Sequence, residues 1–404
     1  MKFLRDLLDK QKPLFQKGGK LEPLYYAFEA GETFLFSPKH TNGIKGAQVK
    51  DAIDLKRMMI TVVIAMIPAL LFGIYNTGHQ HFLATGQGAG LWDNFADKAI
   101  LGLTLVLPIV IVAYAAGGLV EAAFAVIRKH PINEGFLVTG MLIPLVVPAT
   151  LPLWQVALAT IFAVVIAKEV FGGTGMNILN VAMTARAFLY FAYPAQISGD
   201  QVWTYLGDKT AVDGFSGATA LAVAYNAGVE GEAVNTALSS HNSVLGSGIY
   251  EFANLFMGWI PGSIGETSTL MALVGAAILI GTGVASWKII VSGFAGAYIM
   301  GFIMNLFAVN EYMAMGPEYH WVMGGLAFGI VFMATDPVSA AQTETGKWIY
   351  GLLIGALTVI IRVTNPAYPE GIMLAVLFLN VFAPLIDYYV VKANKKRRLQ
   401  RATV

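Results

Sequence analysis

The stretch from Asp213 to Thr219 contains the residue types best suited to chemistry in this sequence. Thr219 offers a hydroxyl that could accept a covalent modification. Ser216, Gly217 and Ala218 are small and would leave space in front of that hydroxyl, and Asp213 could hold or deprotonate it. An ordinary surface turn explains the same residues, because Asp-Gly and Ser-Gly are common turn dipeptides. The spacing alone leaves both interpretations open.

The composition places this stretch in a membrane protein. Of the 404 residues, 56% are hydrophobic and 13% are charged, whereas soluble domains carry roughly 25% charged residues. The net charge of +1 gives no indication of a nucleic-acid partner. The chain has no cysteine, which excludes disulfides and cysteine-ligated metal centres on it. The N-terminal segment is hydrophilic, so we expect no cleavable signal peptide.

Ten apolar segments predict an all-α polytopic fold with about ten transmembrane helices. They cover residues 58–75, 100–127, 135–153, 154–171, 178–193, 270–285, 289–309, 322–334, 349–361 and 372–391. The eighth and ninth have apolar cores of only 13 residues, which is short against the ~20 residues of a full crossing. We therefore expect these two helices to be packed inside the bundle or broken within the membrane.

The distribution of charge predicts the orientation. Residues 1–57 hold eleven Lys and Arg, residues 392–404 hold six, and segment 194–266 holds only Lys209 against seven acids. Because positive segments stay inside, both termini should be cytoplasmic, and Thr219 should face the periplasm. Arg362, at the outer end of the ninth segment, is the one exception.

Two halves of the chain share a pattern that predicts an inverted repeat. The pattern is a tryptophan, a basic residue 14 positions later, a break, and a helix with an asparagine: Trp154, Lys168, 172–177 and Asn180, then Trp348, Arg362, 365–371 and Asn380. Five spans per half would place the copies upside down relative to each other, as in many transporters. Chance similarity between two generic membrane helices is the alternative.

These features divide the chain into five parts. We expect a basic and aromatic cytoplasmic segment (1–57), a first five-helix repeat (58–193), an outer segment with the threonine motif (194–266), a second five-helix repeat (267–391) and a basic cytoplasmic tail (392–404).

Several motifs along nearly the whole chain carry a family resemblance. They are DLKR (54–57), RKH (128–130), NEGF (133–136), AKEVFGGTG (167–175), YPAQISGD (193–200), IPGSIGE (260–266), MATDPVSA (333–340) and NPAYPEG (365–371). With them the sequence resembles the B subunits of the bacterial Na⁺-translocating NADH:quinone oxidoreductases. In that family a flavin transferase joins FMN to a threonine through a phosphoester.

The resemblance implies that Thr219 is the FMN acceptor, within a motif that includes Asp213, Ser216, Gly217 and Ala218. An oxygen-linked flavin agrees with the absence of cysteine. A threonine hydroxyl is a weak nucleophile, so the transferase must supply the base and a metal.

The resemblance further implies a complex that passes electrons from NADH to ubiquinone and exports Na⁺ across the bacterial inner membrane. Five other subunits would be partners, and a non-covalent riboflavin is associated with the membrane part. We expect NADH oxidation on a partner, since the GGTG stretch (172–175) lacks dinucleotide-binding spacing. We expect no tightly bound metal, only transported Na⁺.

Ionisable and hydroxyl residues in the predicted spans are candidates for the ion path, because charge inside a bilayer is costly. Asp336 is the strongest, with Thr335 and Ser339 beside it, and Asp387 and Arg186 are further candidates. A buried structural ion pair, such as Arg186 with Asp387, is the alternative.

Gly117, Gly118 and Glu121 are candidates for the quinone site. The two glycines would leave room for a flat headgroup and match glycines linked to quinone-site inhibitors in the resembled family. Close helix packing is the alternative explanation. The aromatic N-terminal segment could cap such a pocket, or simply lie on the membrane.

Two other functions fit parts of the sequence. One is the D subunit of the related ferredoxin-linked redox complex, which shares the flavin motif and fold. The other is a channel or transporter without redox activity, which the inverted repeat would suit but the threonine motif would not.

Overall fold

The computed structural model describes residues 2–16, 18–26, 28–29, 32, 36, 55–88, 90–129, 132, 135–241, 248–365 and 370–402. Every regular element within these ranges is a helix. Part of the N-terminal segment, including Phe34 and residues 37–54, lies outside them, as do residues 366–369 of the second break.

Within the described ranges, five helices are long and apolar enough to cross a membrane. They are α3 (Leu55–Ala84), α4 (Phe95–Arg128), α13 (Trp287–Leu306), α16 (Glu344–Thr364) and α17 (Ile372–Ala402). Three shorter apolar helices accompany them: α5 (Gly135–Leu145), α7 (Val181–Ala192) and α12 (Thr269–Gly281). The predicted ninth helix, α16, is not broken: it has 21 residues, extends through polar positions on both sides of its apolar core, and is half-buried in the bundle along its most apolar stretch.

Two predicted spans are interrupted. Segment 322–334 forms α14 (Tyr319–Val322), α15 (Leu326–Phe328) and the π-helix η5 (Gly329–Met333), so the prediction of a broken or buried eighth span is confirmed. Segment 154–171 forms α6 (Leu153–Ala163), the π-helix η2 (Val164–Lys168) and the 3₁₀-helix η3 (Glu169–Phe171). Short π-helical segments such as η2 and η5 occur frequently at functional sites.

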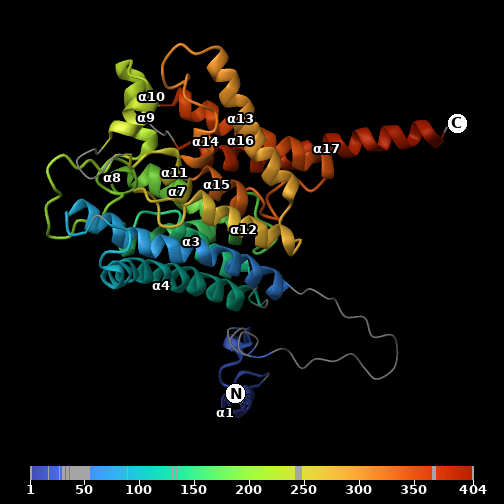
Figure 1. Ribbon diagram of the computed structural model, residues 1–404. Coiled ribbons are helices and arrows are strands. Elements are labelled where there is room, and N and C mark those ends of the chain that lie inside the picture. Colours follow the sequence, from blue (N-terminus) through green and yellow to red (C-terminus); the bar gives the residue numbers. More distant parts are fainter. Residues whose placement is uncertain are drawn as a thin grey trace.

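The long helices lie around a single large apolar core. Helices α3 and α4 run side by side, and α13, α16 and α17 lie across the molecule from α4 (Figure 1). Helix α7, from the first half of the chain, packs against α17 from the second half. The core includes residues of both halves, among them Ile143, Met183, Phe328 and Val376.

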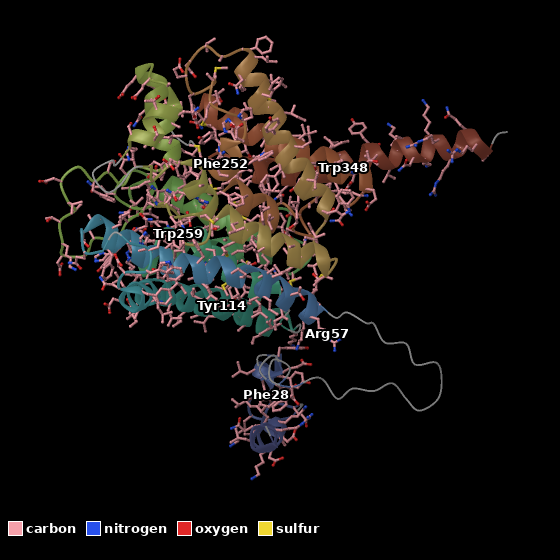
Figure 2. All side chains as sticks on the ribbon, in the orientation of Figure 1. Phe28, Arg57, Tyr114, Phe252, Trp259 and Trp348 are labelled. Carbon is pink, nitrogen blue, oxygen red and sulfur yellow. The ribbon has the colours of Figure 1, made fainter. Side chains whose placement is uncertain are left out.

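The expected outer segment, 194–266, is folded rather than an open loop. It contains α8 (Pro194–Ile197), α9 (Ala220–Glu230), α10 (Val234–Ser240) and α11 (Phe252–Met257). A second hydrophobic core joins this segment to residues far along the chain, such as Tyr312 and Met323. The ring of Trp259 also packs on Phe72 of α3, with ring centroids 4.6 Å apart (Figure 2).

Both ends of the chain carry basic helices. Helix α1 (Lys2–Phe15) is followed by the short η1 (Glu22–Leu24), and Phe15 stacks on Phe28 at 4.5 Å. At the other end, α17 continues as one exposed basic helix beyond the bundle (Figure 1).

Candidate functional site

Thr219 is the N-cap of α9. Its backbone is extended, with φ −72° and ψ 159°, and its Oγ1 accepts a hydrogen bond from the backbone N–H of Ala222 at 3.3 Å. The side chain is half-buried. Threonine satisfies a free N–H in the first turn of a helix in this way. The sequence therefore fixes the threonine at the start of a helix, with its hydroxyl beside the positive end of the helix dipole.

The turn before Thr219 is held against its neighbours. The Tyr250 hydroxyl donates to the carbonyl of Ala218, and the Ser216 Oγ accepts from the backbone N–H of Ala218 at 3.3 Å. A Cβ on Gly217 would lie 2.2 Å from the carbonyl oxygen of Asp200. This close approach, rather than space in front of the hydroxyl, explains why a glycine stands at position 217.

The Asp213 side chain is exposed, and the Thr219 hydroxyl oxygen accepts from the Ala222 N–H. A role for Asp213 in holding or deprotonating the Thr219 hydroxyl stays a prediction.

Thr219 lines a cavity of about 410 Å³. This volume lies in the range of roughly 300–1,000 Å³ that is usual for small-molecule sites. The walls include the aromatic side chains of Tyr190, Trp203 and Tyr225 together with the start of α9. A planar aromatic ligand attached at Thr219 could therefore contact these three aromatic residues.

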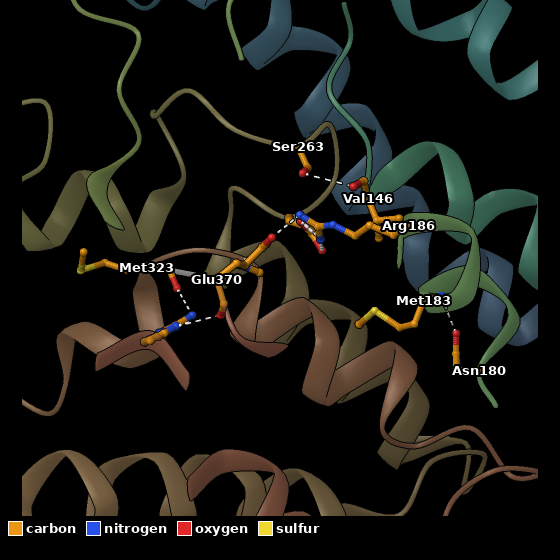
Figure 3. Close-up of polar contacts among 10 residues, drawn as sticks. Val146, Asn180, Met183, Arg186, Ser263, Met323 and Glu370 are labelled. Atoms are coloured by element: carbon orange, nitrogen blue, oxygen red, sulfur yellow. Dashed lines mark hydrogen bonds and ion pairs between the residues drawn. The ribbon is translucent and has the colours of Figure 1, made fainter. Parts of the chain in front are cut away.

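One end of the cavity is a buried charge cluster, which we call the Arg186 cluster and define as Arg186, Glu266 and Glu370. The Arg186 Nη1 donates to the Glu266 Oε1 and Oε2 at 2.6 and 2.7 Å, and its Nη2 donates to Glu370 (Figure 3). Arg186 is 2% exposed and Glu266 is 5% exposed. The alternative prediction of a buried ion pair at Arg186 is therefore confirmed, but its partners are Glu266 and Glu370 and not Asp387.

The cluster joins three parts of the chain. Arg186 lies on α7, Glu266 precedes α12, and Glu370 precedes α17. Burial and the second carboxylate raise the pKa of Glu266 to about 8, although Arg186 lowers it. Two carboxylates that share one guanidinium cannot both ionise as readily as one. Sequence reasoning missed both acids, although each belongs to a glycine- and proline-rich motif quoted above.

Arg362 binds backbone carbonyl groups next to the Arg186 cluster. It is fully buried and donates to the backbone carbonyls of His320, Met323 and Glu370 at 2.7, 2.7 and 3.0 Å. Figure 3 shows the contact with Met323 beside Glu370. Arg362, the one exception to the predicted charge distribution, therefore binds the backbone of Glu370 inside the protein.

The quinone candidates lie at a second buried ion pair. Glu121 is 5% exposed and accepts from the Lys168 ammonium, which also lies 5.9 Å from the ring centroid of Phe136. A Cβ on Gly117 would lie 2.1 Å from the Phe136 ring, whereas a Cβ on Gly118 would meet nothing within 4 Å. Packing therefore explains Gly117, and Gly118 leaves open space.

The ion-path candidates gather in the loop before α16. Asp336 accepts from the Val338 N–H at 3.1 Å and from the Ser339 Oγ at 2.8 Å, while the Thr335 Oγ1 donates to the Val331 carbonyl at 2.6 Å. Thr335 and Asp336 line two cavities, of about 100 and 330 Å³.

Asp387 of α17 reaches the same loop. Its carboxylate accepts from the backbone N–H groups of Gln342 and Thr343, at 2.7 and 2.9 Å, and from the Thr343 hydroxyl. These donors belong to the start of α16, so the structure favours a helix-capping role for Asp387.

The chain matches one protein family and many curated relatives. The NQR2, RnfD, RnfE family matches residues 44–396. The B subunit of the Na(+)-translocating NADH-quinone reductase of Stutzerimonas stutzeri is 49% identical, with 98% of this chain and 99% of the relative covered. The B subunits of the same name from Chromohalobacter salexigens and Pseudomonas aeruginosa are 48% and 47% identical, with 98% of this chain and 96% and 99% of the relatives covered.

Proposed function

The chain belongs to the NQR2, RnfD, RnfE family, and on that premise we propose that it is a membrane subunit of a bacterial Na⁺-translocating NADH:quinone reductase that carries FMN on Thr219. Near full-length identity to proteins named as the B subunit of that enzyme supports the first part. The observation that carries the second part is the position of Thr219, at the start of α9 and on the wall of a large cavity.

The start of α9 suits a phosphoester on Thr219. The Ala222 N–H points at the threonine oxygen, and the positive end of an 11-residue helix stabilises a nearby anion. The cavity beside it offers Tyr190, Trp203 and Tyr225 to a planar ring. Bound FMN would supply the capacity to accept and release electrons, and these residues would orient it and exclude water.

The flavin transferase would supply the groups that attach the flavin. Asp213 is exposed and outside the cavity, so we assign it to recognition by the flavin transferase. The transferase must then provide the base that activates the hydroxyl.

The remaining parts of the proposal follow from the charge pattern and the buried ion pairs. Both termini are cytoplasmic, Thr219 faces the periplasm, and the two halves form an inverted repeat. Electrons pass toward ubiquinone beside Gly118 and Glu121, and Asp336 with Ser339 contributes to the Na⁺ path. The chain would also bind a non-covalent riboflavin, in a position that we do not assign. The five other subunits, one of which oxidises NADH, complete the enzyme.

In-gel flavin fluorescence of the full chain after denaturing electrophoresis tests the central claim. The chain is produced in cells that contain the transferase, beside Thr219→Val and the matched control Thr210→Val, which removes an exposed threonine hydroxyl outside the motif. We expect fluorescence in the wild type and the control and none in Thr219→Val. A dark wild-type band, with the transferase active on another substrate, would overturn the proposal and favour a channel or transporter.

The D subunit of the ferredoxin-linked complex remains the second candidate, because the matching family includes RnfD. Fluorescence on Thr219 does not separate the two. Co-purification does: the proposed function requires an NADH-oxidising partner, and the alternative requires a ferredoxin-oxidising one.

A further inference from the structure

The Arg186 cluster lies on the same cavity as Thr219, but nothing in the proposed function uses it. Its carboxylates are not on the surface, where water and salt would screen them, since Glu266 is 5% exposed and the Glu370 side chain 15% exposed. Charges in such a site act on a neighbouring ligand more strongly than exposed ones do.

Several hydrogen bonds set the positions of the two carboxylates in the Arg186 cluster. Arg186 holds both carboxylates, and Glu370 also accepts from the backbone N–H of Gly325 at 3.3 Å. A Cβ on Gly325 would lie 2.7 Å from the carboxylate carbon of Glu266, so only glycine leaves room for the acid there.

The segment just before Glu266 is also held by hydrogen bonds to the backbone of residues 145 and 146. The Ser263 hydroxyl donates to the Val146 carbonyl at 3.3 Å (Figure 3), and the Gly265 N–H donates to the Leu145 carbonyl at 2.7 Å. These two contacts hold the backbone just before Glu266 against the end of α5 and the residue that follows it.

We propose that the carboxylates of Glu266 and Glu370 lower the midpoint reduction potential of the flavin attached to Thr219. This inference rests on the proposed function. An electron added to the ring places negative charge in the cavity, and fixed carboxylates oppose that charge. Arg186 offsets only part of their effect, because it is one cation shared by two anions. The buried Arg362 lies behind Glu370 and outside the cavity lining.

A redox titration of the full chain tests this inference. The flavinylated protein in detergent is reduced stepwise with dithionite in the presence of mediators, and the flavin absorbance is followed. Dithionite supplies the electrons and is itself oxidised. The titration is run at pH 9, above the pKa of about 8 of Glu266, so that this carboxylate is ionised.

We expect Glu370→Gln and Glu266→Gln each to raise the ratio of reduced to oxidised flavin about ten-fold at a fixed potential, a shift of about 59 mV for a one-electron step. Glu370→Asp keeps the charge and should restore the wild-type potential. Glu230→Gln is the matched control, because Glu230 is exposed at the far end of α9, roughly 16 Å along the helix from Thr219.

The outcomes separate the two claims. A fluorescent band with an unchanged potential in both glutamine variants would overturn the inference and leave the flavin assignment intact. If Glu370→Asp shifts the potential as much as Glu370→Gln, the inference is also overturned and the flavin assignment stays intact. The change would then come from the altered side-chain size and not from the lost charge. A dark wild-type band would overturn the flavin assignment, and the inference with it.

Discussion

Asn180 and Asn380 meet at the buried boundary between α7 and α17. In the amide orientation that satisfies its neighbours, the Asn380 side-chain oxygen accepts from the backbone N–H of Asn180 at 2.9 Å, and its nitrogen lies 2.7 Å from the Tyr350 hydroxyl. Asn180 also caps α7 by accepting from the Met183 N–H at 3.1 Å. Two asparagines 200 positions apart in the sequence thus join the first and second halves of the chain.

Asn380→Ala should lower the stability of the protein by removing this junction. Both groups that Asn380 satisfies, the Asn180 N–H and the Tyr350 hydroxyl, are buried, and each unsatisfied buried group costs about 1–3 kcal/mol. Thermal unfolding in detergent measures the effect. Asn394→Ala, on the exposed end of α17, is the control and should leave the midpoint unchanged. Equal midpoints for the two variants would contradict the proposed role of the junction.

Gly117→Ala and Gly118→Ala should differ sharply although the residues are neighbours. A methyl at position 117 would lie 2.1 Å from the Phe136 ring, and overpacking of this kind typically costs about 1–3 kcal/mol. A methyl at position 118 meets nothing within 4 Å. We expect only Gly117→Ala to lower thermal stability, and Gly118→Ala to change the KM for ubiquinone. If Gly118→Ala leaves the KM unchanged, the headgroup does not lie there.

Glu121→Gln should be strongly destabilising. It leaves the buried Lys168 ammonium without its carboxylate, and breaking a buried pair from one side costs about 3–5 kcal/mol. The matched control is Glu344→Gln, whose carboxylate pairs with Lys288 and Lys347 at the surface. Thermal unfolding of both variants gives the comparison, and a Glu121 variant as stable as the Glu344 variant would show that Lys168 finds another partner.

The pKa of Glu266 predicts a pH dependence of stability. Its pKa is about 8 in the folded protein against an ordinary 4.5, so the folded state binds a proton more tightly than the unfolded state. Stability should therefore fall as the pH rises from about 4.5 to about 8. Glu266→Gln removes this titration and should flatten the curve over that range. A variant whose unfolding midpoint falls as steeply as that of the wild type would contradict the assignment.

Gly217→Ala should impair flavin attachment without touching Thr219. The added methyl would lie 2.2 Å from the Asp200 carbonyl, so the turn must move and carry the Thr219 hydroxyl with it. In-gel fluorescence relative to the wild type and to Thr210→Val, which changes an exposed residue outside the motif, measures the loss. Wild-type fluorescence in Gly217→Ala would mean that the transferase acts on the turn in an unfolded form.

The sequence predicted the helical class well, because the apolar runs that a membrane requires are long and uninterrupted in α3, α4 and α13. It underestimated α16, where polar residues at both ends hide helical turns. It also singled out Thr219, because small and polar residues beside it stand out from an apolar background; the structure places this residue at the start of α9 and on a cavity wall, and its role as FMN acceptor stays a prediction. It could not pair Arg186 with Glu266 and Glu370, since both acids lie in irregular loops whose positions depend on tertiary contacts such as those of Gly265 and Arg362.

The predicted repeat illustrates the same limit. The Trp-to-basic spacing recurs, and both basic residues, Lys168 and Arg362, are buried. Their partners differ, since Lys168 binds a carboxylate and Arg362 binds three backbone carbonyls. Asn180 likewise caps the start of α7, whereas Asn380 lies within α17. Residue spacing predicts equivalent positions, but each site's chemistry depends on the neighbours that folding brings to it.

The second hydrophobic core also has a consequence for how the protein is made. The helix that begins at Thr219 packs into a core completed by Tyr312, Met315, Val322 and Met323. A ribosome reaches these residues only after it has synthesised nearly a hundred more beyond the threonine. The turn can therefore take its final shape only once much of the second half has entered the membrane. Under the proposed function, flavin attachment to Thr219 is then a late event in biogenesis, and a chain truncated before residue 312 should present the threonine poorly to the transferase.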